Sequence, residues 1–348
     1  MMCIPEVLLM AMLTTPPDVD ARPVVSTPHG VRMVDPYRWL REKENPDVLA
    51  YLEAENRYAE QTTAGLAPLR DALYQEMLGR IKEDDRTVPW PASDGWTYFS
   101  RTEEGKAYDI ICRRRGEDGE DEVILDINQL AEGHEFYDVT AWETSPDGTH
   151  LAWLADQTGY EENDLLIKDL VTGEIVDTAV TGANPFTLAW ANDNRTLFYA
   201  RQDEAKRPDR IYRHRLGTPA ADDVMVYHDP DGKFYVSADR SRSGHSILIS
   251  SGSQLTSEWH EIDADRPDDP PRLIAPRRHG IEYDVERHGD RYFIRTNENA
   301  TNFRIMTGRV GDPDPEAWTT FVEHDPDVYL TGLDAFRNHL VVSERRGG

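Results

Sequence analysis

The sequence predicts a mainly β fold of the propeller class, preceded by a short helical segment. Six short aromatic and aliphatic strands recur along the 348 residues, and their centres lie 55, 45, 50, 45 and 48 positions apart. They cover residues 96–101, 150–156, 196–202, 246–252, 291–297 and 339–345. A repeat of roughly 40–50 residues, with several strands in each, is typical of a β-propeller. No partner strands follow the last of the six, so we expect about five complete blades and a partial sixth.

The chain begins with a stretch that carries no regular periodicity. Residues 1–14 are apolar, but they hold no Lys or Arg and are too short to span a membrane. Prolines are frequent over residues 15–28. We therefore interpret 1–28 as an extended or disordered lead-in, with 1–14 as a disordered or mis-assigned start.

Two helices are expected between residues 29 and 85. Asn45 followed by Pro46 is a helix N-cap with proline at the first helical position. A second helix is expected near Pro68, because apolar residues then recur at steps of four. The apolar positions are Val48, Leu49, Leu52 and Tyr58 in the first helix, and Leu69, Leu73, Met77 and Ile81 in the second. These helices form a segment distinct from the remainder of the chain.

Residues 86–348 contain almost only strand and turn signals. Turn sequences such as Pro146-Asp147-Gly148 and Pro230-Asp231-Gly232 recur close to the repeating strands. A further strand follows each of the first five repeating strands, which indicates antiparallel meanders. A pair of β-sandwiches shares this turn density but lacks the regular period, and it remains the structural alternative.

Composition limits the partners and the compartment. The net charge of −27 disfavours nucleic acid and anionic membranes as partners, and only weakly favours basic ligands. Two cysteines, Cys3 and Cys112, form no redox motif or metal spacing. We expect a cytoplasmic protein without cofactor or metal.

The usual catalytic motifs do not occur in this sequence. The nearest approach to a G-x-S-x-G nucleophile turn is Gly244-His245-Ser246-Ile247-Leu248, which lacks the final glycine. Neither H-E-x-x-H nor a phosphate-binding loop is found. Asp156 and Glu344 follow repeating strands, which leaves open a five-bladed glycosidase that uses paired acids.

Several phrases resemble the prolyl oligopeptidase family of serine peptidases, and are most similar to its oligopeptidase B branch. Their order and spacing from residue 29 to 345 carry the resemblance. They are His29-Gly30, Asp35-Pro36-Tyr37-Arg38-Trp39-Leu40, Leu125-Asp126-Ile127-Asn128 with Leu130-Ala131-Glu132-Gly133, Ser145-Pro146-Asp147-Gly148, Trp190-Ala191-Asn192-Asp193 with Thr196-Leu197-Phe198-Tyr199, Arg213-His214 with Leu216-Gly217-Thr218, and Asn297 with Asn302-Phe303.

The resemblance implies a two-part enzyme of which this chain matches the first part. Family members join a seven-bladed propeller to an α/β-hydrolase domain with a Ser-Asp-His triad, and the oligopeptidase B branch cleaves short peptides after Arg or Lys. The triad would follow Gly348, so the hydrolase domain is expected to be absent from this chain and no catalytic residue is assigned. Whether the chain is an enzyme is left open, and alone it is expected to be inactive.

The same resemblance suggests five site residues. Asp156 and Glu161 belong to a turn that leaves the second blade towards the domain interface, where Glu161 would pair with a basic group. Tyr37, Trp39 and Leu40 would dock on the hydrolase domain. The expected partners are short basic peptides, bound by the complete enzyme, and the hydrolase half, encoded in the same gene or a downstream reading frame. The alternative from another functional class is a stand-alone propeller that binds peptides or proteins without catalysis.

Overall fold

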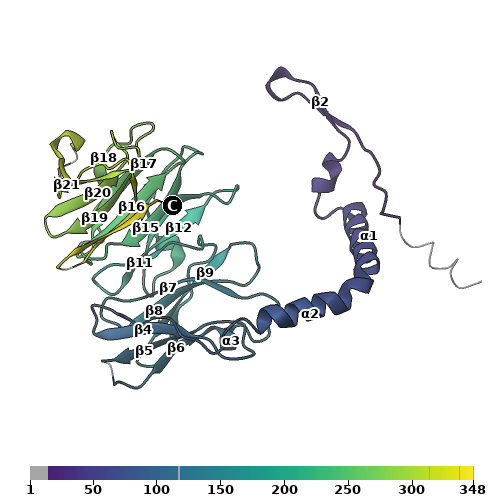
Figure 1. Cartoon of the computed structure of the whole chain (residues 1–348), viewed down its shortest axis with the longest axis horizontal. Helices are drawn as coiled ribbons and strands as arrows, with labels where there is room; N and C mark the ends of the chain where they lie inside the picture. The colour runs from purple at the N-terminus through teal and green to yellow at the C-terminus, as the bar shows by residue number, and fades with distance from the viewer. Residues whose placement is uncertain (1–14, 117, 313, 337, 348) are drawn as a thin grey trace, which may run out of the picture. The chain divides into compact units, whose positions relative to one another are not determined.

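The computed structural model describes residues 15–116, 118–312, 314–336 and 338–347. These residues divide into two compact units, one up to Lys82 and the other from Glu83 onwards (Figure 1). The predicted disordered or mis-assigned start at residues 1–14 lies outside the described residues. Among the described helices, none combines the length and the apolar composition that crossing a membrane requires.

The first unit consists of a small hairpin and two helices. Its elements are β1 (Val24–Ser26), η3 (Pro28–Gly30), β2 (Met33–Asp35), η4 (Arg38–Arg41), α1 (Pro46–Thr63), η5 (Ala64–Leu66) and α2 (Ala67–Leu78). The predicted cap is confirmed: the Asn45 side chain accepts the backbone N–H of Asp47 at 3.0 Å, and Pro46 begins α1. Val48 is buried, whereas most of the predicted apolar positions on both helices are exposed within this unit.

The second unit contains five four-stranded antiparallel sheets and one two-stranded sheet in its described part. We call these sheets blades 1 to 6, in chain order. Their strands are β3 (Trp90–Pro91), β4 (Trp96–Arg101), β5 (Ile110–Arg115), β6 (Glu122–Asp126); β7 (Asp138–Thr144), β8 (His150–Asp156), β9 (Asn163–Asp169), β10 (Ile175–Asp177); β11 (Leu188–Trp190), β12 (Thr196–Gln202), β13 (Pro208–Arg215), β14 (Val224–His228); β15 (Tyr235–Arg240), β16 (Ser246–Gly252), β17 (Ser257–Asp263), β18 (Arg272–Ala275); β19 (Tyr283–His288), β20 (Arg291–Thr296), β21 (Arg304–Arg309), β22 (Thr319–Val322); and β23 (Val328–Ala335), β24 (Leu340–Arg346). Three short helices lie between strands, namely α3 (Ile127–Leu130), η6 (Ala220–Asp222) and η7 (Pro315–Ala317).

This arrangement confirms the predicted propeller of five complete blades and a partial sixth. The six repeating strands of the sequence are the second strand of each blade. In β8, six of the seven residues are buried, because both faces of a second strand pack against neighbouring blades. A strand buried on both faces needs apolar residues at successive positions, which explains why these strands stand out in the sequence.

The hydrophobic core lies between successive blades. One cluster joins Leu154 and Ile167 of blade 2 to Trp190 and Leu197 of blade 3. A second joins Phe198 of blade 3 to residues of blade 4, and similar clusters join blades 1 and 2, 4 and 5, and 5 and 6. Stability is therefore shared among contacts between neighbouring blades, as in other repeat folds.

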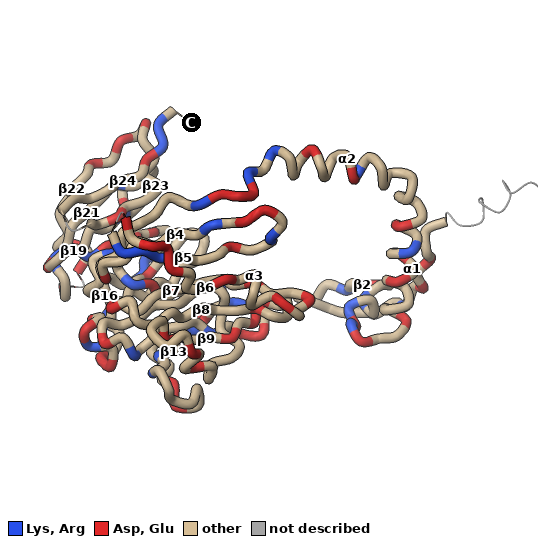
Figure 2. Tube along the Cα trace, turned by 90° about the horizontal axis from the view of Figure 1, so that it is seen from below, with Lys and Arg blue, Asp and Glu red and all other residues tan. Residues whose placement is uncertain are grey.

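Antiparallel pairing places several loops on one face of the second unit. In each complete blade, the start of the first strand, the hairpin between the second and third strands and the end of the fourth strand lie at the same edge. We call the face formed by these edges the linker face. It carries the hairpins 157–162, 203–207 and 253–256 and the links between blades. Acidic residues occur along both units rather than in one segment (Figure 2).

Candidate functional site

Asp156 lies at the end of β8, on the linker face, and is 3% exposed. Its Oδ1 accepts the backbone N–H groups of Thr158 and Gly159, at 2.8 and 2.9 Å, and the Thr158 hydroxyl at 2.8 Å. Its Oδ2 accepts the Glu161 backbone N–H at 2.8 Å. Burial alone would raise the pKa of Asp156, but these hydrogen bonds lower it below its ordinary value. Asp156 is thus an ionised carboxylate that is fully engaged in shaping the hairpin.

The backbone of Glu161 is fixed on both sides. Its φ of 57° lies in the left-handed region, which a non-glycine residue adopts at a cost. Its N–H donates to Asp156, and its carbonyl accepts Gln202 Nε2, from the neighbouring blade, at 3.0 Å. Glu162 forms an ion pair with Lys206 of that same blade. The exposed Glu161 side chain therefore starts from a well-held position on the linker face.

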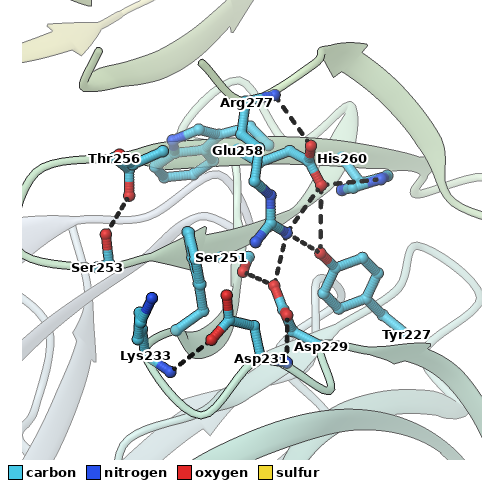
Figure 3. A network of polar contacts seen from close by, with 12 residues as sticks. Tyr227, Asp229, Asp231, Lys233, Ser251, Ser253, Thr256, Glu258, His260 and Arg277 are labelled. Carbon is cyan, nitrogen blue, oxygen red and sulfur yellow. Dashed lines mark hydrogen bonds and ion pairs between the residues drawn. The ribbon is translucent and has the colours of Figure 1, made fainter. Parts of the chain in front are cut away.

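A network of charged residues on the same face connects blades 3 and 4 to the link that follows β18 (Figure 3). The Arg277 Nη2 lies 2.5 Å from Asp229 Oδ2 and 3.1 Å from Glu258 Oε1. The Ser251 hydroxyl also donates to Asp229 Oδ2, at 2.5 Å. Burial would raise the pKa of both carboxyl groups, but Ser251 and Arg277 lower that of Asp229, and Arg277 lowers that of Glu258. The hydroxyl of Ser251 is therefore bonded to a carboxylate, and we assign it no nucleophilic role.

A buried arginine shapes the link between blades 3 and 4. The Arg207 Nη1 donates to the carbonyl oxygens of Asp229, Asp231 and Phe234, at 3.3, 3.0 and 2.7 Å. The Arg277 guanidinium carbon lies 4.0 Å from the centre of the Phe234 ring. Arg207 and Arg277 together fix the loop that precedes β15.

This loop forms one side of a groove of about 620 Å³ on the linker face. The groove is lined by the link before β15, the hairpin between β16 and β17 and the link after β18. The lining residues are Asp231, Gly232, Lys233, Phe234, Tyr235, Ser253, Gln254, Leu255, Thr256, Arg277 and His279. They include cationic, acidic, polar and apolar groups, which suits contact with a peptide or a protein surface. The described residues include no group of three or more His, Cys, Asp or Glu side chains placed to hold a metal ion.

The three residues predicted to dock lie together in the first unit, but they differ in exposure. Trp39 is 7% exposed; its indole N–H donates to the carbonyl of Asp20 at 3.0 Å, and the Arg22 guanidinium carbon lies 3.9 Å from the ring centre. Tyr37 is 46% exposed, and Leu40 is half-buried. Tyr37 therefore offers more surface for docking than Trp39, which packs within its own unit.

Helix α2 carries a larger apolar surface than these three residues. Leu69, Leu73 and Met77 recur at steps of four along the helix and are 57%, 47% and 59% exposed. On α1, Leu49 and Leu52 are also exposed. Within the first unit, these side chains have no core to enter, and contiguous exposed apolar residues of this kind mark interaction surfaces.

The turn at residues 156–161, predicted to leave the second blade, is the hairpin that joins β8 to β9 within blade 2, and the Arg207 and Arg277 networks were not predicted. Arg277 and Asp229 are 48 positions apart, and Arg207 and Phe234 are 27 apart. No local spacing marks such pairs, because they meet only when successive blades pack together. For Asp156 there was a local signal, since Asp followed by Thr and Gly at the second and third positions favours a side-chain-capped turn.

Comparisons with known proteins agree with the propeller and its repeat. A family model described as "Prolyl oligopeptidase, N-terminal beta-propeller domain" matches residues 16–348. The chain is 39% identical, over 99% of its length, to Dipeptidyl aminopeptidase BI of Pseudoxanthomonas mexicana, and 33% identical, over 92%, to Protease 2 of Moraxella lacunata. It covers 50% and 47% of those two proteins, so it spans about half the length of the curated relatives that it matches.

Solved structures give the same result. Oligopeptidase B from Leishmania major superimposes with a TM-score of 0.88 at 29% identity, over 96% of this chain and 50% of that one. Oligopeptidase B from Trypanosoma brucei superimposes with a TM-score of 0.87 at 30% identity and the same coverage. The chain therefore belongs to the prolyl oligopeptidase family and comprises that family's N-terminal β-propeller region.

Proposed function

We propose that this chain is the substrate-gating propeller of an oligopeptidase B-like serine endopeptidase that cleaves short peptides after Arg or Lys. The observation that carries the proposal is the match of residues 16–348 to the family's propeller, together with about half the length of the relatives. In this proposal an α/β-hydrolase domain supplies the Ser-Asp-His triad, and the propeller limits access to it. The chain by itself is inactive, because acyl transfer needs an activated serine.

The first unit is proposed to dock on the hydrolase domain through α2, Tyr37 and Leu40, together with the small exposed part of Trp39. The exposed stripe Leu69, Leu73 and Met77 supports this proposal, because removing its apolar surface from water is favourable by roughly 25 cal/mol per Å². A second apolar surface, on the hydrolase domain, is the occupant that this stripe requires.

Glu161 is proposed to face the cleft between the propeller and the hydrolase domain. Its backbone is held by Asp156 and Gln202, so its carboxylate is presented from a fixed point on the linker face. A basic side chain of the substrate, or of the hydrolase domain, would pair with it there. In the complete peptidase, Glu161→Gln should reduce kcat/KM for peptides with Arg more than for neutral peptides, and an equal loss on both would contradict this role.

The acidic surface is proposed to help gather basic peptides, in agreement with the net charge of −27. This attraction should weaken as salt is added, because ions screen charges over about 10 Å at 0.1 M. A kcat/KM that does not change with ionic strength would argue against it. The cytoplasm is the proposed compartment, and cell fractionation with an antibody to the chain tests this.

Removal of dipeptides from a free amino terminus is the second candidate activity. The 39% identity to a protein named Dipeptidyl aminopeptidase BI favours it. In the complete peptidase, cleavage that requires a free α-amino group would support this candidate. Equal cleavage of an N-acetylated peptide would support the endopeptidase.

The direct experiment uses the purified chain and a fluorogenic Arg-Arg substrate. We expect no turnover and no covalent labelling by a serine-directed phosphonate. Turnover that the phosphonate abolishes would overturn the proposal that this chain is only the gate. The coding sequence after residue 348 supplies a second test, because the proposal expects a G-x-S-x-G motif within the next few hundred codons.

A further inference from the structure

A buried histidine joins blade 2 to blade 3. His214, in β13, has a fully buried side chain. Its Nδ1 lies 2.7 Å from Asp223 Oδ1, in the same blade, and its Nε2 lies 3.2 Å from Asp177 Oδ2, at the end of β10 in blade 2. The two carboxylate side chains are only 2% and 5% exposed. The imidazole therefore bridges two carboxylates across the interface between the blades.

Backbone groups hold the Asp177 carboxylate in place. The Gly217 N–H of blade 3 donates to Asp177 Oδ2 at 2.5 Å, and the Ala179 N–H donates to Oδ1 at 2.9 Å. These bonds orient the Asp177 carboxyl group towards the ring.

Groups from β12 hold Asp223 on the other side of the ring. The Tyr199 hydroxyl donates to Asp223 Oδ2 at 2.8 Å, and the Arg201 Nε lies 3.3 Å from that hydroxyl oxygen. The titratable and charged groups that face His214 are thus Asp177 from β10, Asp223 after η6, and Tyr199 with Arg201 from β12.

This arrangement suits an imidazolium better than a neutral imidazole. Between two fixed acceptors, both ring nitrogens must donate, and only the protonated ring carries two N–H groups. A neutral ring would turn a lone pair towards one of the carboxylates. Burial alone would lower the pKa of His214, but the hydrogen bonds and charges of Asp223 and Asp177 raise it above the ordinary value.

Solvent can approach the bridge from the outside. A groove of about 390 Å³ lies beside it, lined by residues 175–179 of blade 2 and 217–219 of blade 3. Asp177 and Gly217 belong both to the lining of this groove and to the bridge. A small separation of the two blades would therefore let water reach the ring and remove its proton.

We propose that His214, held between Asp177 and Asp223, is a proton-dependent clamp that keeps blades 2 and 3 together while the imidazole is charged. Loss of the proton leaves two buried carboxylates facing a neutral ring, and the contact between the blades loosens. The clamp is independent of the proposed peptidase activity, because it rests on contacts within the propeller alone.

The direction of the pH effect is set by the raised pKa. A group whose pKa is higher in the folded than in the unfolded state contributes its full stability below the unfolded value, which is about 6.5 for histidine. That contribution is lost as the pH rises through the folded value. The clamp therefore predicts loosening on the alkaline side of pH 6.5.

The first test is an NMR titration of the full chain with labelled histidine. His214→Gln identifies the resonance of His214 among the 11 histidines. We expect this resonance to titrate above 6.5, and to move down by about one pH unit in Asp177→Asn, because an opposite charge within 4–6 Å shifts a pKa by 1–3 units. Titration of the wild-type ring at or below 6.5 would overturn the proposal, whether or not the variants fold.

The second test compares thermal midpoints between pH 6 and pH 9. The difference in Tm between the wild type and His214→Gln should be largest near pH 6 and should shrink as the pH rises. His245→Gln, at an exposed turn before β16, is the matched control and should follow the wild type at every pH. A difference for His214→Gln that stays constant over this range would contradict a proton-dependent clamp.

Hydrogen exchange separates a clamp from a residue that merely supports the fold. After correction for the intrinsic increase with pH, exchange of the Gly217 amide should accelerate in the wild type as His214 loses its proton. In Asp177→Asn, the same acceleration should begin at a lower pH. Corrected exchange that is independent of pH in the wild type would contradict separation of the blades.

Discussion

Replacing Asp156 by asparagine should loosen the hairpin that presents Glu161. The Asp156 carboxylate accepts three backbone N–H groups and one hydroxyl at 2.8–2.9 Å, and asparagine offers only one oxygen to the same donors. Its NH₂ group must face at least one N–H, so at least one hydrogen bond to a charged acceptor is lost. Such a bond is worth about 1.5–3 kcal/mol. Because the freed amides lie close to solvent, we expect Asp156→Asn to cost about 2 kcal/mol, near the lower end of this range.

Differential scanning calorimetry measures this cost as a change in Tm. One kcal/mol corresponds to about 2–4 °C in domains of 150–250 residues, so we expect Tm to fall by about 4–8 °C. The effect should be complete above about pH 4 and should shrink as the pH falls further, because the pKa of Asp156 is lowered in the folded protein. Below the folded pKa, the wild type also loses its charged acceptor.

Asp164 supplies the matched control for this prediction. It lies in β9, where burial and the charge of Asp156 raise its pKa. Neutralising it by Asp164→Asn should therefore leave Tm unchanged or raise it slightly. The reasoning is refuted if both variants lose the same stability, or if Asp156→Asn melts like the wild type.

Three further predictions concern other parts of the chain. Arg207→Lys should increase hydrogen exchange over residues 229–234, because a single ammonium group cannot hold the three carbonyls and the Asp203 carboxylate at once, as the planar guanidinium does. Unchanged exchange would show that the loop is ordered without Arg207. Burial and a neighbouring carboxylate raise the pKa of Glu286 to about 7, so the folded state loses stability as the pH rises from about 4.3 to 7. Glu286→Gln should therefore flatten the plot of Tm against pH over this range. A plot for the variant that runs parallel to that of the wild type would contradict this prediction. Replacing the exposed Leu73 and Met77 by serine should leave Tm within about 1 °C of the wild-type value and should reduce binding of a hydrophobic dye, because neither side chain packs into a core in this unit. A large loss of Tm would mean that both side chains are buried.

Much of the propeller could be predicted from the sequence, because the second strands of blades 2, 3 and 4 are almost fully buried. The residues of β8 and β12 form nearly continuous apolar runs, which are visible without knowledge of their neighbours. The first strands were harder to find, since β3 has two residues and β11 has three. Such short segments carry too few positions for a period to be recognised.

The candidate site was less predictable, because its contacts join distant parts of the sequence. The Asp156 turn has a local signal, whereas the bridge from Asp177 through His214 spans 37 positions. Arg277 reaches Asp229 over 48 positions. The packing of one blade on the next brings these groups together, and this packing is not encoded by the spacing of the residues themselves. The proposed role of Glu161 remains a prediction, because it depends on a surface beyond the propeller.

The gating role is tested most directly by comparing short and long substrates in a chimeric peptidase. Residues 1–348 would be joined to the half of Moraxella lacunata Protease 2 that lies beyond the matched region, where our proposal places the hydrolase domain. We predict that the chimera, shown to be folded by phosphonate labelling of its serine, cleaves a short Arg-containing peptide but not the same sequence within a folded protein. Equal cleavage of both substrates by the labelled chimera would contradict the claim that this chain is a gate.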